Sequence, residues 1–291
     1  MPSLSCAQEF SGAITLGYSA SDLSDTATDV DTMTFDGRFG LEADNGLHFG
    51  ADISGLKADI DGVSEDVNET LAGIYGGIRF GNGAAGGLYV ETAELDIDGL
   101  GDVSLDSYGL MAGYEAEGAR VSGFYGISET DPDLPAGMDI ADFGASFSYT
   151  GSEGYTIGAS AQRTELSADG MPDIDIDFAG IAGSYAVSPG WTLFGGLSDA
   201  SIDLIDTDLT TVGFGVSYDL STVTRANASL SLELARSELE VAGVQGDADT
   251  VRLGLSIPLG GRGFTVPMNS VADAVLNPRH NALTSADLST F

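Results

Sequence analysis

The stretch MTFDGRFGLEADNGLHFGADI, residues 33–53, decides the fold class, because it alternates regularly on both sides of a turn. Apolar side chains take every second position before and after the turn: Met33, Phe35, Phe39 and Leu41, then Leu47, Phe49, Ala51 and Ile53. A period of two predicts strands, and Asn45-Gly46 between them is a strong hairpin signal. One face of this hairpin is apolar, and the other carries Asp, Arg and His. The apolar face therefore lies either on a soluble core or against lipid.

The composition limits the class of protein. The chain has 291 residues, of which 41 are glycine and 43% are apolar, too many for a disordered acidic chain. The formal charge of −35 makes nucleic-acid binding very unfavourable. No run of eighteen or more apolar residues predicts a transmembrane helix, but a transmembrane strand needs only about 9–11 alternating residues.

The alternation recurs along most of the chain and predicts an antiparallel sheet of fourteen strands, with 12–16 as the range. The expected strands lie near residues 9–20, 31–42, 47–57, 68–80, 87–96, 105–114, 119–128, 140–150, 155–165, 176–187, 191–199, 208–218, 226–238 and 249–259. No shift of composition divides this run, so a single domain, 9–259, is expected. Residues 260–291 lack the alternation and are predicted to form a C-terminal tail.

The connections between these expected strands alternate in length. Every second one is short, as at residues 43–46 (ADNG) and 115–118 (EAEG), whereas the others are around 8–12 residues and mostly acidic. Outer-membrane barrels have short periplasmic turns and longer extracellular loops. A soluble sandwich has no reason to sort its turns in this way. The pattern therefore favours a transmembrane barrel.

Aromatic residues near the short turns give a second indication. Seven of them lie within about three residues of such a turn and belong to the apolar face of their strands: Phe80, Tyr114, Tyr149, Tyr155, Tyr185, Trp191 and Tyr218. Aromatic girdles of this kind mark the membrane interface of barrels. In a soluble protein the same residues would be core aromatics, with no reason to gather at one end.

On these features the chain resembles Gram-negative outer-membrane barrels of the porin-like kind, over about residues 10–259. The resemblance implies outer-membrane lipids and lipopolysaccharide as surroundings, the barrel-assembly machinery as a partner, and a monomer or homotrimer. Such barrels tend to end on an aromatic residue after an alternating strand. Here the last alternating strand ends at Leu259, and Phe291 at the terminus follows a stretch without alternation.

If the apolar side chains of each expected strand face lipid, the side chains at the alternate positions line the lumen. These inward side chains are mostly small or hydrophilic. Fourteen strands lined in this way should leave a pore. The charged and histidine residues of the inward sets are the candidate pore-lining residues: Asp36, Arg38, His48, Asp52, Arg79, Arg120, Asp142, Glu233 and Arg252. Charged rings can set ion preference in a channel. The alternative is that these residues are paired, solvated wall residues without a selective role.

Other chemistry is poorly supported by the sequence. The Asp59-x-Asp61-Gly62 loop fails the spacing of a calcium-binding EF-hand, and His48 has no recognisable nucleophile motif near it. We therefore expect no enzyme activity, catalytic residue, metal or cofactor. Ser5-Cys6-Ala7 fits the end of a signal peptide, so residues 1–8 are read as its remnant or as a disordered N-terminus.

The sequence therefore predicts an outer-membrane channel for passive diffusion of small hydrophilic solutes and ions, with a weak cation preference from its acidic mouth. One alternative is a non-conducting structural or surface-interaction barrel, whose lumen the tail or loops close. The other is a secreted soluble acidic all-β adhesin. The tail is expected to be periplasmic, with a disordered state as the default and a short helix at residues 269–276; plugging of the pore is one of its alternatives.

Overall fold

The computed structural model describes residues 8–24, 28–62, 67–97, 101–135, 137–168, 170, 172–260 and 266–290. The strands are β1 (Gln8–Leu23), β2 (Thr28–Ala43), β3 (Leu47–Ile60), β4 (Val67–Arg79), β5 (Ala84–Ile97), β6 (Gly101–Ala116), β7 (Ala119–Asp131), β8 (Met138–Thr150), β9 (Tyr155–Ala168), β10 (Ile174–Ser188), β11 (Trp191–Ile202), β12 (Thr207–Asp219), β13 (Ser229–Val241) and β14 (Val244–Pro258). Two 3₁₀ turns, η1 (Asp203–Ile205) and η2 (Leu220–Thr222), and two helices, α1 (Val271–Leu276) and α2 (Ala282–Thr290), complete the elements. The signal-peptide hypothesis and Phe291 fall outside the described residues.

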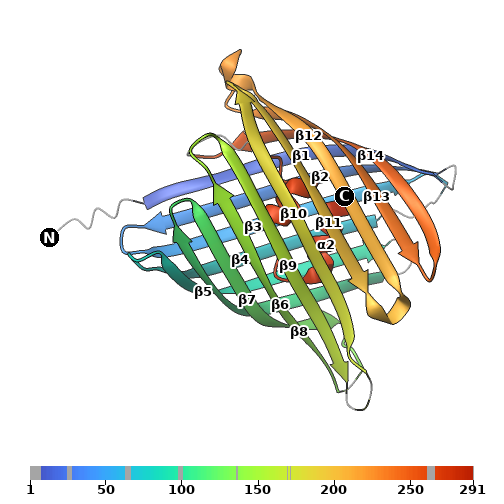
Figure 1. Cartoon of the computed structure of the whole chain (residues 1–291). Coiled ribbons are helices and arrows are strands. Elements are labelled where there is room, and N and C mark those ends of the chain that lie inside the picture. The colour runs from blue at the N-terminus through green and yellow to red at the C-terminus, as the bar shows by residue number, and fades with distance from the viewer. Residues whose placement is uncertain are drawn as a thin grey trace.

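The fourteen strands form one closed barrel (Figure 1). Each strand pairs antiparallel with its neighbours in sequence, and β1 pairs with β14 from Ala13↔Pro258 to Leu23↔Ala248 to close the ring. The predicted fold class and strand number are therefore confirmed. At the Asn45-Gly46 turn, Gly46 takes a φ of 83°, which favours glycine, and its N–H donates to the Ala43 carbonyl.

The strands run further than expected at the end of the barrel where β1 joins β2, which we call the acidic end. Connections there contain two to six residues, and only Ala242 and Gly243 join β13 to β14. The cause is an inversion of the pattern: in β10, Ile174 and Ile176 face inward, whereas Asp177 faces outward. The expectation placed apolar residues outward throughout, so these acidic strand ends were read as loops.

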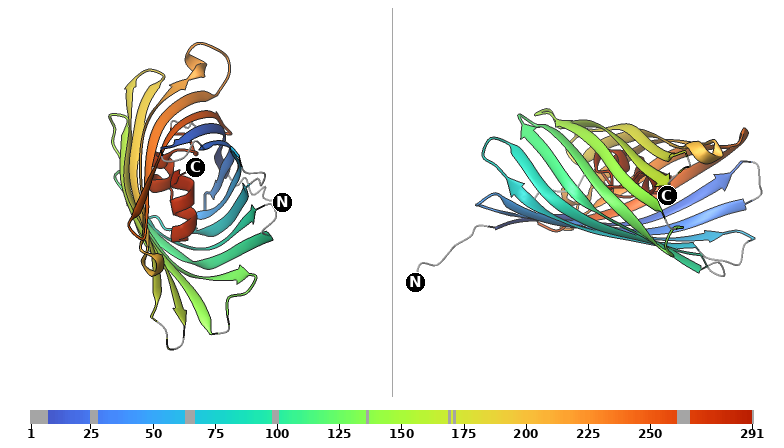
Figure 2. Two further views of the ribbon diagram at one scale, coloured as in Figure 1. Left: turned by 90° about the vertical axis from the view of Figure 1, so that its right-hand side faces the viewer. Right: turned by 90° about the horizontal axis from the view of Figure 1, so that it is seen from below.

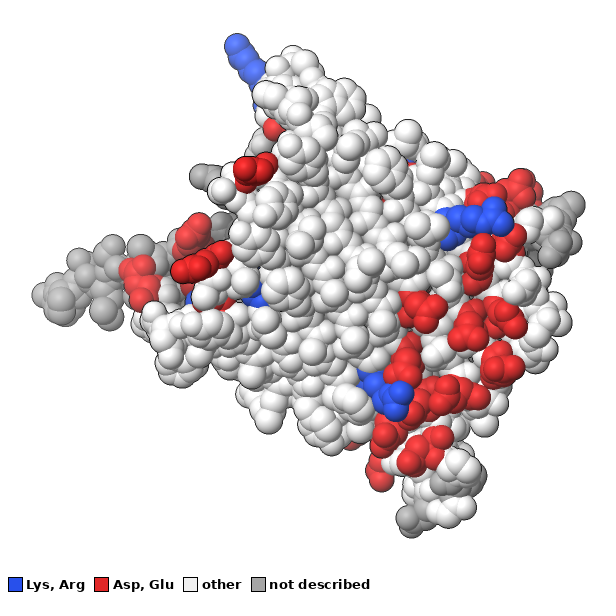
Figure 3. Space-filling view, in the orientation of Figure 1, with Lys and Arg blue, Asp and Glu red and all other residues white. Residues whose placement is uncertain are grey.

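The opposite end, where β2 joins β3, we call the turn end. The seven predicted girdle residues lie there on the outer face, and the Trp191 ring lies 4.5 Å from the ring of Tyr218 on the neighbouring strand, tilted by 44°. Their contact with a membrane interface stays a prediction. The acidic residues, in contrast, gather mainly at the other end of the barrel (Figure 3, right).

Between the two ends the outer surface is a belt of apolar side chains. Ile74, Leu110 and Phe214 keep 64%, 61% and 61% of their surface exposed. A soluble protein would bury such a belt, whereas a transmembrane barrel turns it to lipid. The soluble adhesin alternative is therefore wrong.

Residues 266–290, which we call the closing segment, lie inside the barrel. Figure 2 shows both C-terminal helices enclosed by the strands. The segment therefore lies across the middle of the lumen instead of hanging free below it. No helix within the described residues is long and apolar enough to span a membrane.

Candidate functional site: the lumen and its closing segment

The nine predicted pore-lining residues all project inward, because successive side chains of a strand alternate between its two faces. Several stand beside each other in the strand register, such as Arg38↔Asp52 and Glu233↔Arg252. Three of them, however, hydrogen-bond the closing segment instead of facing open water, namely Arg38, Asp142 and Arg252, and Asp52 forms an ion pair with it. Their role in ion selectivity stays a prediction.

The strongest contact joins β2 to α1. The Arg38 guanidinium donates to both carboxylate oxygens of Asp273, from Nη1 at 3.1 Å and from Nη2 at 3.0 Å. Its Nε donates to Asp52 on β3 at 3.1 Å. Two-pronged pairs of this kind are among the strongest side-chain interactions and fix orientation as well as charge. Asp273 is positioned because the Ser270 hydroxyl caps α1 by accepting from the Asp273 N–H at 3.1 Å.

Arg279, between the two helices, makes a second contact with the same wall. Its Nη1 lies 3.5 Å from Asp52, and its Nη2 donates to the Ser54 hydroxyl at 2.9 Å. Asp52 thus lies between two arginines, one from the wall and one from the closing segment. This charge chain explains why an inward acid on β3 stands next to an inward arginine on β2.

His280 occupies a third site, formed by β5 and β7. Its backbone N–H and its Nδ1 lie 3.0 and 2.8 Å from the two carboxylate oxygens of Glu91. The imidazole stacks on the Tyr89 ring at 3.8 Å and meets the edge of Phe124 at 4.9 Å. Wall and segment are therefore joined here by an acid and two aromatic rings.

The start of α2 is held by polar groups of β8 and β9. The Asn281 amide donates to Asp142 at 2.8 Å, and the Ala282 N–H donates to the Thr164 hydroxyl at 3.1 Å. The Ser285 hydroxyl donates to Gln162 at 3.2 Å. These bonds fix the start of α2 against β8 and β9.

Arg252 of β14 holds the other end of α2. Its Nη2 donates to the carbonyls of Ser289 and Thr290 at 3.1 and 2.6 Å, while its Nη1 pairs with Glu233 at 3.1 Å. A cation at a helix C-terminus satisfies the last carbonyls and the helix dipole. Arg252 is almost fully buried, so its charge is committed to these contacts.

Inward glycines make the room into which α1 fits. A Cβ on Gly196 of β11 would lie 3.1 Å from the Ala272 backbone, and one on Gly180 of β10 would lie 2.5 Å from a Val275 methyl. The same close approach occurs on β9, where Gly158 lies against Leu276, and on β12, where Gly213 lies against Val271. The glycines of β9–β12 thus form a shallow seat for the helix.

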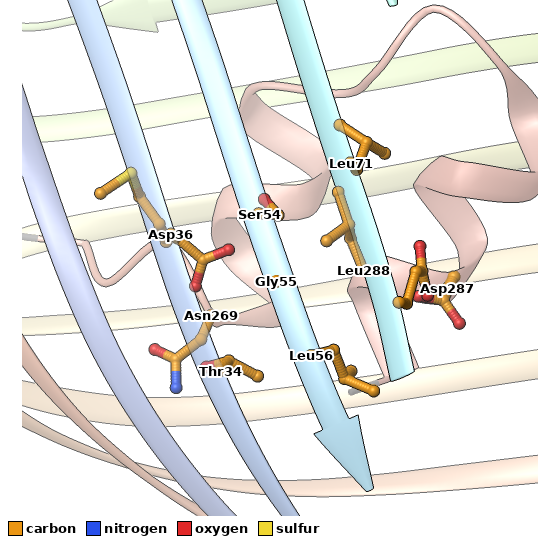
Figure 4. Close-up of a pocket in the computed structure, with 11 residues that line it drawn as sticks. Thr34, Asp36, Ser54, Gly55, Leu56, Leu71, Asn269, Asp287 and Leu288 are labelled. Carbon is orange, nitrogen blue, oxygen red and sulfur yellow. The ribbon is translucent and has the colours of Figure 1, made fainter. Parts of the chain in front are cut away.

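On the opposite wall the segment packs against β2–β4 (Figure 4). Asn269, Asp287 and Leu288 from the segment line a cavity of only about 20 Å³ with wall residues of these strands. Asp287 is buried beside the carboxyl group of Glu69. Burial, and then the hydrogen bond and charge of Glu69, raise the pKa of Asp287 well above its ordinary range.

Of the remaining predicted residues, Asp36 lines the small cavity beside β2–β4, and three others line a larger cavity at the turn end. His48, Arg79 and Arg120 surround a space of about 460 Å³, together with Glu115 and His280. Arg79 and Arg120 both pair with Glu115, at 3.5 and 3.1 Å. This cavity lies on the turn-end side of the closing segment.

Several residues of the site escaped the sequence analysis. Glu91 was missed because the expected strand at 87–96 assigned poorly to faces. Asp273, Arg279 and His280 were missed because the tail shows no pattern of its own. The signal that existed was in the wall, where inward glycines lie on the neighbouring strands β9–β12.

Residues 100–238 match the model of a family described as Gram-negative porin. No curated protein matches the chain. Among solved structures, an anion-selective porin from Comamonas acidovorans is similar with a TM-score of 0.56 and 11% identity, over 87% of this chain and 100% of that one. A FadL homologue from Pseudomonas aeruginosa is similar with a TM-score of 0.52 and 11% identity, over 86% and 90%.

At such low identity, the similarity to these solved structures shows the fold and nothing further. Together with the family match, the closed barrel and its apolar belt make the chain a porin-like β-barrel of the Gram-negative outer membrane.

Proposed function

We propose that this barrel is a channel for passive diffusion of small hydrophilic solutes and ions, held closed by residues 266–290 and opened when they leave the lumen. The observation that carries the proposal is the way in which the closing segment is bound. Many of its contacts with the wall are ion pairs and hydrogen bonds to side chains such as Arg38, Glu91 and Asp142. They accompany one apolar cluster, in which Phe178 of β10 packs with Val275, Ala282 and Ala286. Water can replace the polar contacts, so a wall of this kind suits both a docked segment and a water-filled lumen.

The lumen without its closing segment would be acidic. The inward acids outnumber the inward arginines: Asp36, Glu42, Asp52, Glu69, Glu91, Glu115, Asp142 and Glu233 stand against Arg38, Arg79, Arg120 and Arg252. One sign of charge in a cleft concentrates counter-ions. A weak cation preference of the open channel is therefore part of the proposal.

Single-channel recording in a planar bilayer with a salt gradient tests the proposal. The full chain should show rare openings, and a variant that ends at Gly260 should show steady steps with a reversal potential on the cation side. An anion-side reversal would refute the predicted preference but not the channel.

The alternative is a non-conducting structural barrel, favoured by the number of buried contacts that hold the segment. Silence from a folded variant that ends at Gly260 would establish it. A change of gel mobility on boiling shows that the barrel has folded. The expected lack of enzyme activity and of a cofactor stays a prediction, as do the assembly machinery and the choice between monomer and trimer.

A further inference from the structure

A second cavity lies at the acidic end of the lumen, on the other side of the closing segment from the turn-end cavity. It measures about 380 Å³, and its wall lining comes from one continuous arc of neighbouring strands, β12–β14 followed by β1–β5. Its lining is mostly aliphatic: Leu23, Val30, Leu56, Leu95, Leu209 and Leu239. Asp287 and Thr290 of the closing segment also line it.

This apolar lining follows from the inverted pattern of the strand ends. Leu209 and Leu239 are direct cross-strand partners, and both point inward while acidic residues take the outer face. The inward leucines do not cover one another: Leu95 and Leu239 keep 39% and 43% of their surface exposed. Apolar surface turned into a cavity and left uncovered is the usual sign of a site for an apolar molecule.

The charges around the cavity restrict what it takes. The ionisable residues in its described lining are Glu69, Asp247 and Asp287, all of them acids. Asp247 is already paired with Arg236 at 2.6 Å, so an anionic head group would find no cationic partner in the described lining and would meet the acidic outer surface around it (Figure 3). An uncharged or cationic molecule would not be repelled.

We propose that the lumen at the acidic end is a binding site for a small apolar molecule that is uncharged or positively charged. The cavity volume falls within the range of about 300–1,000 Å³ typical of small-molecule sites. The site is independent of the proposed channel activity, because it needs only the docked state of the closing segment.

Gly246 offers a clean test of this site. It lines the cavity, and a Cβ built on it meets nothing within 4 Å, so Gly246→Phe directs a ring into the cavity from an unobstructed backbone position. Gly55→Phe is the matched control, because Gly55 of β3 precedes Leu56 of the lining but faces outward, with only the Glu69 carbonyl at 4.0 Å from its Cβ position.

The probe is N-phenyl-1-naphthylamine, an uncharged aromatic dye, titrated by fluorescence into nanodiscs that hold the full chain, with empty nanodiscs as background. Saturable binding by wild type and Gly55→Phe, weakened at least roughly tenfold in Gly246→Phe, is expected. Equal binding in Gly246→Phe, or no saturable binding in wild type, would overturn the site. The sulfonated anionic form of the dye should bind far more weakly, and equal affinity for it would overturn the assigned charge class.

Discussion

The ion pair between Arg38 and Asp273 should hold the closing segment in the lumen more firmly than any other single contact. The side chain of Asp273 is only 5% exposed and accepts both bonds from Arg38. Asp273→Asn removes the charge and leaves the guanidinium with Asp52 alone. Loss of one partner of a buried pair costs about 3–5 kcal/mol. Arg38 keeps Asp52 and is 21% exposed, so about 3 kcal/mol is expected here.

That free energy corresponds to a roughly 100-fold rise in the population with the closing segment released. The assay is labelling of a cysteine at Ser285, which is fully buried in the docked segment, by a membrane-impermeant maleimide. The single native cysteine, Cys6, is replaced by serine in every variant. Labelling should be about 100 times faster in Asp273→Asn than in wild type.

Asp139→Asn is the matched control, because Asp139 of β8 faces outward and is exposed. It should label at the wild-type rate. Arg38→Met combined with Asp273→Asn should cost less than the sum of the two single changes, since the two residues share one interaction. Equal labelling rates for Asp273→Asn and Asp139→Asn would refute the reasoning.

Three further predictions concern the seat, the pH dependence and the girdle. Gly196→Leu should clash with α1, weaken docking of the closing segment by about 1–3 kcal/mol and raise the single-channel open time. Gly40→Leu is the control, because Gly40 faces inward but contacts only Ser11, and it should leave the open time unchanged. Because the pKa of Asp287 is raised in the docked state, docking should strengthen as pH falls toward the ordinary range of aspartate and weaken as pH rises. Cysteine labelling should therefore speed up with pH, and less so in Asp287→Asn. Trp191, the single tryptophan, should be quenched more by lipids brominated near the headgroup than at the chain end.

The barrel itself could be predicted from the sequence because each strand shows its own local pattern. The Asn45-Gly46 turn, the alternation around it and the repeated spacing were enough for the strand number. The strand ends were placed too early because the apolar face changes sides along the strand. At Ile174 and Ile176 the apolar residues point inward, and period two alone does not tell inside from outside.

The closing segment was harder to predict for a different reason. It contains only two short helices, and its position depends on contacts between residues far apart in sequence, such as Arg38 and Asp273. A local pattern cannot show such a contact. Inward charges were correctly found on the wall, but nothing in their own strands told whether water or a folded segment would face them.

The central claim is that this segment closes the channel, and a reversible crosslink tests it most directly. Gly180→Cys and Val275→Cys lie in contact across the seat, since a Cβ on Gly180 would be 2.5 Å from a Val275 methyl. The pair is placed in the Cys6→Ser, Asp273→Asn chain, and single-channel current is recorded before and after reductant. We predict silence in the oxidised protein and conducting steps after reduction. The same current in both states would contradict the account.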